Sequence, residues 1–419
     1  MENYKCKSVG IIGSGIQGVC IGYQLIKKGV KVTLFDKHDP LSNNYKPASY
    51  GNAGHFSPYA VLQLNRPDIM YDVPKMLLSS YGPLALKWNY VPKMLRWIFH
   101  YFKNCNEKSM LHTAKYMHQI LNLSKNAYEE IFQEIDTSGL VEKKGIIYVW
   151  TNNNLKSRNL EIKIRNDLGI KQKILNQKQV LELEPNLNPV FESGVIFEDA
   201  MHARDPHGIL KQIFKLYLKK GGKFVQTEVK SLEQKDETET IIKSEIEDFK
   251  FEKAVIATGA FSKKFTDQLG ENIPLDTERG YHVHFKNKDN LISRPVIFLD
   301  RGFGMTPMNQ GLRAVGTVEL GGLKNPLSKK RIEYIVNCAK ELLPQLGKHD
   351  DEWLGFRPTL PDFLPILGPS KKNKNIIYAF GHQHLGWTLG AITGKIVSGI
   401  VAEEKTNLDL TPYSSKRFN

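Results

Sequence analysis

A glycine cluster near the start of the chain has the spacing needed to bind a phosphate group. It reads Gly13-Ser14-Gly15-Ile16-Gln17-Gly18, and Asp36 follows 23 residues after Gly13 (36 − 13). In this pattern the first glycine permits a tight turn, the second lets the backbone approach a pyrophosphate, and the third lets a helix pack on the preceding strand. The Asp36 carboxylate is suited to hydrogen-bond an adenosine ribose and disfavours a 2′-phosphate. The pattern predicts a dinucleotide site and leaves NAD and FAD open. The alternative is an ordinary strand-helix-strand unit without a ligand.

Two later segments also end in small residues that could approach the same ligand. An apolar strand from Phe251 runs into Ala257-Thr258-Gly259-Ala260. The strand Ile376 to Phe380 runs into Gly381 to Gly390, which reads GHQHLGWTLG and leads into a helix. Glycines that lead into a helix favour a polar or anionic ligand at its N-terminus. NAD enzymes do not need the first of these elements, whereas flavoproteins with two dinucleotide-binding segments often show it.

Two His-x-His pairs, His282/His284 and His382/His384, could be read as metal ligands. Alternation along a strand would bring both rings of a pair to one face. No third ligand with suitable spacing follows either pair, so we expect no metal site.

The elements that must position these residues follow from the pattern of apolar residues. Val9 to Asp36 reads as strand, tight turn, helix and strand, and a helical pattern runs from Pro74 to about Glu134. From Ile273 to Val318, short strand-like runs alternate with turns, which predicts an antiparallel sheet in a second domain. We therefore expect an α/β protein in which a Rossmann-like dinucleotide domain is interleaved with an α+β domain.

Length and composition exclude several classes of protein. The 419 residues suffice for two or three domains, and the formal net charge of +14 comes from scattered lysines without an arginine-rich run, so we expect no nucleic-acid partner. The stretch from Trp88 to Lys103 mixes aromatic and basic residues; a pair of core helices is the favoured interpretation, and a membrane-surface helix is the alternative. The four cysteines lie far apart, which suits a reducing cytosol, and no stretch approaches the ~18 apolar residues of a spanning helix.

As an ordered set, these motifs resemble a known family. GSGIQG with Asp36, ASYGNAG, VIATGA, GFRPTLPD and GHQHLGWTLGAITG occur in the order found in the FAD-dependent D-amino-acid oxidase superfamily. The sequence is most similar to bacterial D-amino-acid dehydrogenases and D-hydroxyproline dehydrogenases, and the likeness is weakest from about Pro74 to Leu175. The resemblance implies a discontinuous FAD-binding domain (residues 1–80, 195–272 and 345–419) and a substrate domain (81–194 and 273–344) whose antiparallel sheet covers the flavin.

The resemblance also implies which residues bind FAD. Relatives with covalent flavin carry a histidine where this chain has Gly51, so non-covalent FAD is implied. The segment Gly381 to Leu389 is expected to close over the flavin. The implied cofactor-binding residues are Gly13, Ser14, Gly15, Gln17, Gly18, Asp36 and Lys37 for the adenosine diphosphate half, Val229 near the adenine, Thr258 and Gly259 near the pyrophosphate, and Asn52, Ala53, Gly54, Gly386, Trp387, Thr388 and Leu389 near the isoalloxazine.

Three residues are implied as catalytic. An amino acid oxidised over a flavin needs its carboxylate held by a bidentate cation, and Arg357 in GFRPTLPD matches the family's carboxylate-binding arginine. The alternative is a structural arginine paired with Asp362. Tyr281 matches a position that faces the substrate in relatives, although a half-buried sheet tyrosine is nearly as good an interpretation. His384, together with His55, is a candidate for contact with flavin or substrate.

The function expected from the resemblance is oxidation of the Cα–N bond of an amino acid, a D-amino acid or a proline-like imino acid, by hydride transfer to flavin N5. A quinone or another respiratory-chain component would accept the electrons, and the enzyme would be cytoplasmic, with a peripheral contact to the inner face of the membrane as a further option. The alternatives are a glycine or sarcosine type of amine oxidase that uses O2, and a FAD-binding subunit of an amine dehydrogenase complex.

Overall fold

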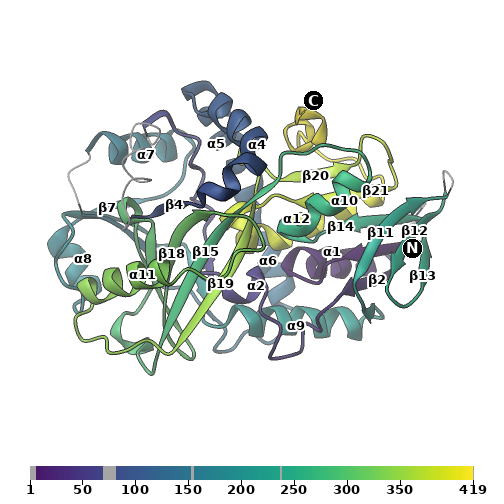
Figure 1. The fold of residues 1–419 in the computed structure, drawn as a ribbon. Coiled ribbons are helices and arrows are strands. Elements are labelled where there is room, and N and C mark those ends of the chain that lie inside the picture. Colours follow the sequence, from purple (N-terminus) through teal and green to yellow (C-terminus); the bar gives the residue numbers. More distant parts are fainter. Residues whose placement is uncertain (1–5, 69–81, 152–154, 236–237, 419) are drawn as a thin grey trace.

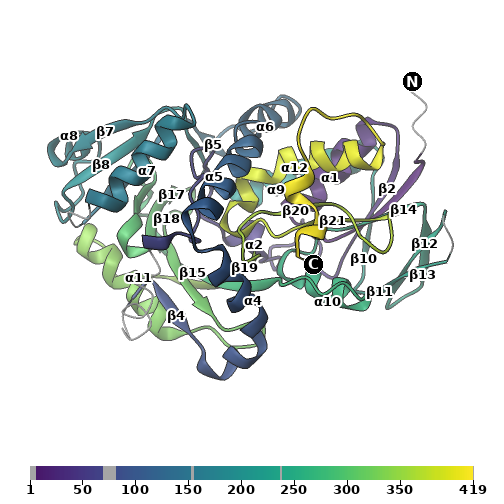
Figure 2. The same cartoon turned by 90° about the horizontal axis from the view of Figure 1, so that it is seen from above.

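The computed structural model describes residues 6–68, 82–151, 155–235 and 238–418. Two large sheets lie side by side, one mainly parallel and one mainly antiparallel (Figures 1 and 2). The first residues of the stretch for which helices were expected from Pro74 lie outside the described residues. Within the described part of the chain, no helix combines the length and the apolar character needed to cross a bilayer.

The mainly parallel sheet has six strands. Their order across the sheet is β10 (Lys223–Gln226), β2 (Lys31–Asp36), β1 (Ser8–Ile12), β14 (Lys253–Ile256), β21 (Ile376–Phe380) and β20 (Ile366–Pro369), with β20 alone antiparallel to its neighbour among these pairs. Helices α1 (Ile16–Lys27), α9 (Pro206–Lys219) and α12 (Gly386–Val401) bury one face of this sheet. A small sheet of β11 (Val229–Gln234), β12 (Thr240–Ser244) and β13 (Asp248–Phe251) packs on the other. Burial on both faces explains why the central strands β14 and β21 are apolar runs without alternation.

The large sheet has nine strands. Its order is β19 (Asp351–Thr359), β15 (Asp276–Lys286), β18 (Gly311–Leu320), β17 (Phe303–Met308), β16 (Val296–Phe298), β6 (Ile146–Trp150), β8 (Ser193–Phe197) and β7 (Lys173–Asn176), with β4 (Leu84–Leu86) also paired to β18. Helix α11 (Lys329–Leu342) covers one face and packs on Tyr281, Val283 and Phe285 of β15. The alternate residues of β15 point to the opposite face, which is where the functional cavity lies.

The remaining elements connect the two sheets. They are α2 (Ala48–Gly51), α4 (Val91–Asn104), α5 (Glu107–Leu121), α6 (Ser124–Phe132), α7 (Leu155–Asp167), α8 (Gln177–Leu183) and α10 (Ser262–Gln268), and a second small sheet in the order β3 (His55–Phe56), β9 (Met201–Ala203), β5 (Val141–Glu142). Helix α8 begins with a capping box in which Asn176 and Gln179 bond each other's backbone N–H groups.

The expected α/β architecture with two interleaved sheets is confirmed. The domain boundaries remain a prediction. Two strands, however, belong to the nine-stranded sheet although the boundaries place them in the FAD-binding domain. Strand β19 lies at the edge of the large sheet and β8 lies inside it, although residues 345–419 and 195–272 were assigned to the FAD-binding domain. Both strands join the nine-stranded sheet through backbone pairing, which the order of elements along the chain does not reveal.

Candidate active site

A cavity of about 600 Å³ runs between the carboxyl ends of the parallel strands and one face of the large sheet. Its volume lies in the range typical of sites for small molecules and cofactors. The expected site residues that line it are Gly13, Gly15, Gln17, Asp36, Lys37, Asn52, Ala53, Val229, Thr258, Gly259, Arg357, His384, Gly386 and Trp387. Segments from residues 12–53 and from residues 227–387 therefore meet at one elongated site, with Asp36 and Arg357 among its walls.

The glycine cluster forms the turn between β1 and α1. Gly13 has φ +103°, and a Cβ on Gly18 would lie only 1.9 Å from the carbonyl oxygen of Gly13, so the turn and the close helix packing both require glycine. At Gly15 an added Cβ would meet only the Ser49 hydroxyl, at 3.3 Å, so its absence leaves room for a ligand at the start of α1. The positive end of the helix dipole lies there.

Asp36 ends β2 beside this turn. Its Oδ2 accepts hydrogen bonds from the backbone N–H and the hydroxyl of Ser14, both at 2.9 Å, and its Oδ1 accepts from the N–H of His38 at 3.1 Å. The carboxylate is thereby fixed in the wall of the cavity, where it can accept hydrogen bonds from a ribose. Ser14 itself does not line the cavity and acts on Asp36 instead.

Several buried polar atoms in the wall have no hydrogen-bond partner among the described residues. They are Oε1 of Gln17, Oγ1 of Thr227, Oε1 of Gln383 and Nε1 of Trp387. Gln17 is held in place because its Nε2 donates to the carbonyl of Gly386 at 2.6 Å, which joins α1 to the start of α12. Leaving such atoms unpaired in a folded protein is costly, so they indicate a polar ligand that extends along the cavity.

The loop from Ala48 to Gly54 forms one side of the cavity. The Ser49 hydroxyl accepts from the N–H of Ile16 at 3.0 Å, and Asn52 both donates to the Ser49 carbonyl and accepts from the N–H of Gly54. The ring of Trp353 lies against this loop: a Cβ on Gly51 would come within 2.2–2.4 Å of its atoms. The loop is therefore a rigid part of the wall, and position 51 has no room for a side chain.

The first histidine pair, His282 and His284, supports this loop through hydrogen bonds, directly and through Arg313. The Nδ1–H of His282 donates to the Gly51 carbonyl at 2.9 Å, and its ring stacks on Trp353. His284 accepts from the Nε–H of buried Arg313, whose Nη1 donates to the carbonyl of Asn52 at 2.5 Å. Burial and the charge of Arg313 lower the pKa of both histidines, that of His284 to about 3. In the described ranges of the chain, no group of three or more His, Cys, Asp or Glu side chains could hold a metal.

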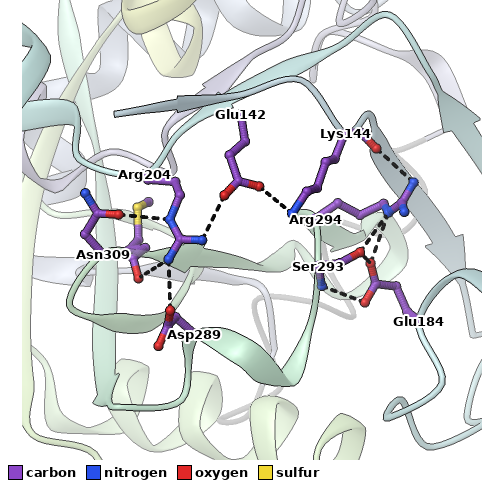
Figure 3. Close-up of polar contacts among 9 residues, drawn as sticks. Glu142, Lys144, Glu184, Arg204, Asp289, Ser293, Arg294 and Asn309 are labelled. Atoms are coloured by element: carbon purple, nitrogen blue, oxygen red, sulfur yellow. Dashed lines mark hydrogen bonds and ion pairs between the residues drawn. The ribbon is translucent and has the colours of Figure 1, made fainter. Parts of the chain in front are cut away.

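A charged network holds the loop from its other end, at Gly54. Figure 3 shows Arg204, just after β9, bonded to Glu142 and Asp289 at 2.9 Å each and to Asn309. The preceding residue, Ala203, pairs its N–H with the Gly54 carbonyl at 2.7 Å. Gly54 has φ +73° and no space for a Cβ against the Ala203 carbonyl, so it supports the loop and does not line the cavity.

Arg357 occupies the large-sheet end of the cavity. Its side chain crosses β15, so that a Cβ on Gly280 would lie 2.3 Å from Nη2, and its Nη1 donates to the Thr317 carbonyl at 2.9 Å. Asp362, considered as its structural partner, instead accepts from Arg417 near the C-terminus. Among the described residues, Arg357 makes no ion pair, and its guanidinium can therefore bind a carboxylate from the cavity.

The other two residues expected to be catalytic lie in different surroundings. His384 lines the cavity, and surrounding protein atoms together with the charge of Arg357 lower its pKa to about 4, so its ring is neutral at pH 7. Tyr281 lies on the opposite face of β15, fully buried against α11 with its hydroxyl bonded to Glu319. The expectation that Tyr281 faces the substrate therefore does not match its position, because successive residues of a strand face opposite sides: Gly280 faces the cavity and Tyr281 faces α11.

Thr388 and Leu389, two further residues expected near the flavin, do not line the cavity. Thr388 accepts from the N–H of Ser57 and donates to the carbonyl of His55, which ties α12 to β3. Leu389 is fully buried in the core beside α1. His55 bonds Thr306 and does not line the cavity.

Sequence reasoning did not single out several residues of the wall. They are Ser49, Thr227, Gly280, Trp353, Phe356 and Gln383. A usable signal existed for Gly280 and Gly355, because a glycine inside a strand often marks a close approach of another group. Thr227 stands in no recognisable motif, and only its unpartnered buried oxygen reveals it, whereas Gln383 lies inside the GHQHLGWTLG segment.

Comparisons with known proteins agree with this geometry. Residues 8–400 match the family described as FAD dependent oxidoreductase. The chain is 31% identical to a D-amino-acid oxidase of Bradyrhizobium diazoefficiens, over 98% of this chain and 99% of that protein, and 27% identical to a D-amino acid dehydrogenase of Vibrio atlanticus, over 97% and 99%. Among solved structures, glycine oxidase from Geobacillus kaustophilus superimposes with a TM-score of 0.76 at 21% identity, covering 98% of each chain. L-proline dehydrogenase from P. horikoshii superimposes with a TM-score of 0.74 at 17% identity, covering 99% of this chain and 98% of the other.

Proposed function

The chain belongs to the family of FAD-dependent oxidoreductases, and on that premise we propose that it oxidises the Cα–N bond of an amino acid whose carboxylate binds Arg357. It is an enzyme of the D-amino-acid oxidase and dehydrogenase type, acting on CH–NH groups. The observation that carries the proposal is the position of Arg357: a cation in the cavity wall, with one backbone acceptor and no carboxylate partner among the described residues.

The cavity fits FAD. The space at Gly15, the N-terminus of α1 and the carboxylate of Asp36 suit the adenosine diphosphate half. The unpartnered atoms of Gln17, Gln383 and Trp387 offer hydrogen bonds along the remaining length. Bound FAD supplies the hydride acceptor for the oxidation.

We propose that FAD binds without a covalent link. The ring of Trp353 fills the place of any side chain at position 51, with approaches of 2.2–2.4 Å to an added Cβ. A histidine cannot enter there unless the indole and its stacking partner His282 move.

Arg357 and the cavity walls would orient the substrate. A guanidinium that takes both carboxylate oxygens fixes the plane of the substrate and aims its Cα–H in one direction. Hydride loss requires a neutral amine, and a largely apolar cavity that excludes water favours the neutral form. The neutral ring of His384 adds no positive charge beside Arg357 that would repel the ammonium form of the substrate as it first approaches. The product would be an imine that hydrolyses to a 2-oxo acid, or that persists if cyclic.

A D-amino acid or a proline-like imino acid is the proposed substrate class, supported by the D-amino-acid oxidase and dehydrogenases to which the chain is similar. A complete cavity and a free Arg357 in one chain favour catalysis over a role as a non-catalytic subunit. The test is anaerobic titration of the yellow protein with D- and L-amino acids, including proline and hydroxyproline, read as loss of flavin absorbance. If neither a D- nor an L-amino acid bleaches the flavin, the proposal is contradicted.

A quinone at a membrane surface is the proposed electron acceptor, with O2 as the alternative. Helix α4 lies at the periphery of the molecule (Figures 1 and 2) and exposes Leu95, Phe99 and Phe102, with Trp88 just before it. The basic residues Lys93, Arg96 and Lys103 accompany them. An exposed apolar face bordered by positive charge fits the interface of an anionic bilayer. Oxygen uptake compared with reduction of a soluble quinone distinguishes the two acceptors.

A further inference from the structure

A second ionisable side chain, Glu278, lies beside Arg357 in the large sheet. The two residues stand directly opposite each other in the antiparallel pairing of β15 and β19. Glu278 precedes Gly280 by two residues, so both belong to the face of β15 over which the Arg357 side chain crosses. The Glu278 carboxylate thus lies on the same face of the sheet as the Arg357 guanidinium, which we propose to bind the substrate carboxylate.

Glu278 is buried without a direct partner. Its side chain is 2% exposed, and among the described residues it forms neither a hydrogen bond nor an ion pair. The charged or titratable groups that act on it are Arg357 from β19 and Tyr101 from α4, while its neighbour on β18 is the apolar Leu320. A buried carboxylate is ordinarily paired, so this arrangement calls for an explanation.

We propose that Glu278 is a positioning residue that sets how strongly Arg357 attracts the substrate carboxylate, with the attraction weakened when Glu278 is ionised. This inference rests on the proposed function of Arg357. An ionised Glu278 neutralises part of the guanidinium charge and repels a second carboxylate; a protonated Glu278 does neither. Substrate affinity then depends on the protonation state of a group that does not itself line the cavity.

The sign and range of the effect follow from the surroundings. Burial raises the pKa of Glu278 to about 7, and the charge of Arg357 opposes this rise. His384, the other titratable group beside Arg357, has a pKa of about 4, and the pKa of Tyr101 is far above its ordinary value. Among the described residues, Glu278 is therefore the group acting on Arg357 that we expect to change charge between pH 6 and 8. Because a carboxylate ligand favours protonated Glu278, affinity is highest below pH 7 and falls as the pH rises.

The test uses the FAD-loaded enzyme and benzoate, a carboxylate without an amine that is ionised throughout this pH range. Calorimetry and flavin absorbance would give its Kd between pH 6 and 8. We expect the Kd to rise by up to about tenfold, with uptake of up to roughly half a proton per benzoate near pH 7.5. In E278Q the Kd should stay near the low-pH value at every pH, with no proton uptake.

A matched carboxylate-to-amide change on the same sheet is E352Q, since Glu352 lies on β19 and pairs with Lys329 away from the cavity. This variant should keep the wild-type pH profile. A wild-type Kd constant within twofold from pH 6 to 8, or an unchanged profile in E278Q, would overturn the inference while leaving Arg357 as the carboxylate site. If benzoate fails to bind at every pH in all three proteins, the assignment of Arg357 fails as well. The wild-type profile and proton uptake decide the question even if E278Q does not fold.

Discussion

Substitution of Gly280 by alanine tests the role of Arg357 without changing any charged residue. The backbone of Gly280 lies in the regular strand β15, so alanine is compatible with its conformation. The added Cβ, however, would lie 2.3 Å from Nη2, 2.4 Å from Cζ and 2.8 Å from Nη1 of Arg357. Ordinary contact begins near 3.4 Å, so the guanidinium would have to move by about 1.1 Å (3.4 − 2.3).

That displacement sets the expected loss. A shift of about 1 Å in a group that orients the substrate can cost about 100-fold in rate. The same range follows from a weakened hydrogen bond between the displaced guanidinium and the substrate carboxylate, since a hydrogen bond to a charged group contributes about 1.5–3 kcal/mol, or roughly one to two decades. We therefore expect Gly280→Ala to lower kcat/KM by about tenfold to a hundredfold.

The assay is steady-state kinetics with the best amino acid from the anaerobic panel, together with FAD content and melting temperature. FAD content should not change, because the nearest expected cofactor residues lie on other segments of the wall. Gly347→Ala is the matched control, since a Cβ there would meet nothing within 4 Å, and it should keep wild-type kinetics. Wild-type kcat/KM in a folded, FAD-loaded Gly280→Ala enzyme would refute the placement of Arg357 at the substrate carboxylate.

Three further predictions follow from the same site and surface. Arg357→Lys should lower kcat/KM by at least roughly tenfold with FAD retained, because an ammonium lacks the two parallel N–H donors; steady-state kinetics check this, and a near-native value would move the carboxylate role elsewhere. Acid precipitation should release the yellow colour into the supernatant, because position 51 has no room for a linking side chain; flavin that stays in the pellet would contradict non-covalent binding. Co-sedimentation with anionic liposomes should weaken in Arg96→Gln and at high salt, since each basic residue near the bilayer contributes about 1 kcal/mol; binding that ignores lipid charge would exclude this contact.

The dinucleotide half of the site could be predicted because its chemistry is local in the sequence. The turn at Gly13, the open position at Gly15 and the carboxylate of Asp36 lie within one strand-helix-strand unit, whose geometry leaves little freedom. The strand after Lys253 and the helix after Gly386 were also recognisable, because each joins an apolar strand to small residues. These predictions needed no knowledge of contacts between distant segments.

The substrate half could not be predicted to the same depth, because β15 is buried on both faces. From Thr277 to Phe285 every residue of the strand is buried. Apolar and polar residues alternate from Tyr281 to Phe285, but either face of a strand that is buried on both sides could line the cavity. Tyr281 was assigned to the cavity and lies against α11, whereas Gly280 one residue earlier lies under Arg357. A shift of one residue in a strand exchanges its two faces, and only the packing of α11 settles the choice.

Proximity in sequence was equally uninformative about the partners of charged groups. Asp362, five residues from Arg357, pairs with Arg417, which also donates to the Leu364 carbonyl and so ties the C-terminal segment to the loop after β19. Arg357 remains without a carboxylate within ion-pairing distance among the described residues, although Glu278 stands opposite it in the sheet. Because Arg357 has no such ion pair, its guanidinium can bind both oxygens of an incoming carboxylate, as a residue that anchors the substrate must. Asp362 is thus engaged by Arg417, a residue 55 positions away in the chain, which its short spacing from Arg357 does not reveal.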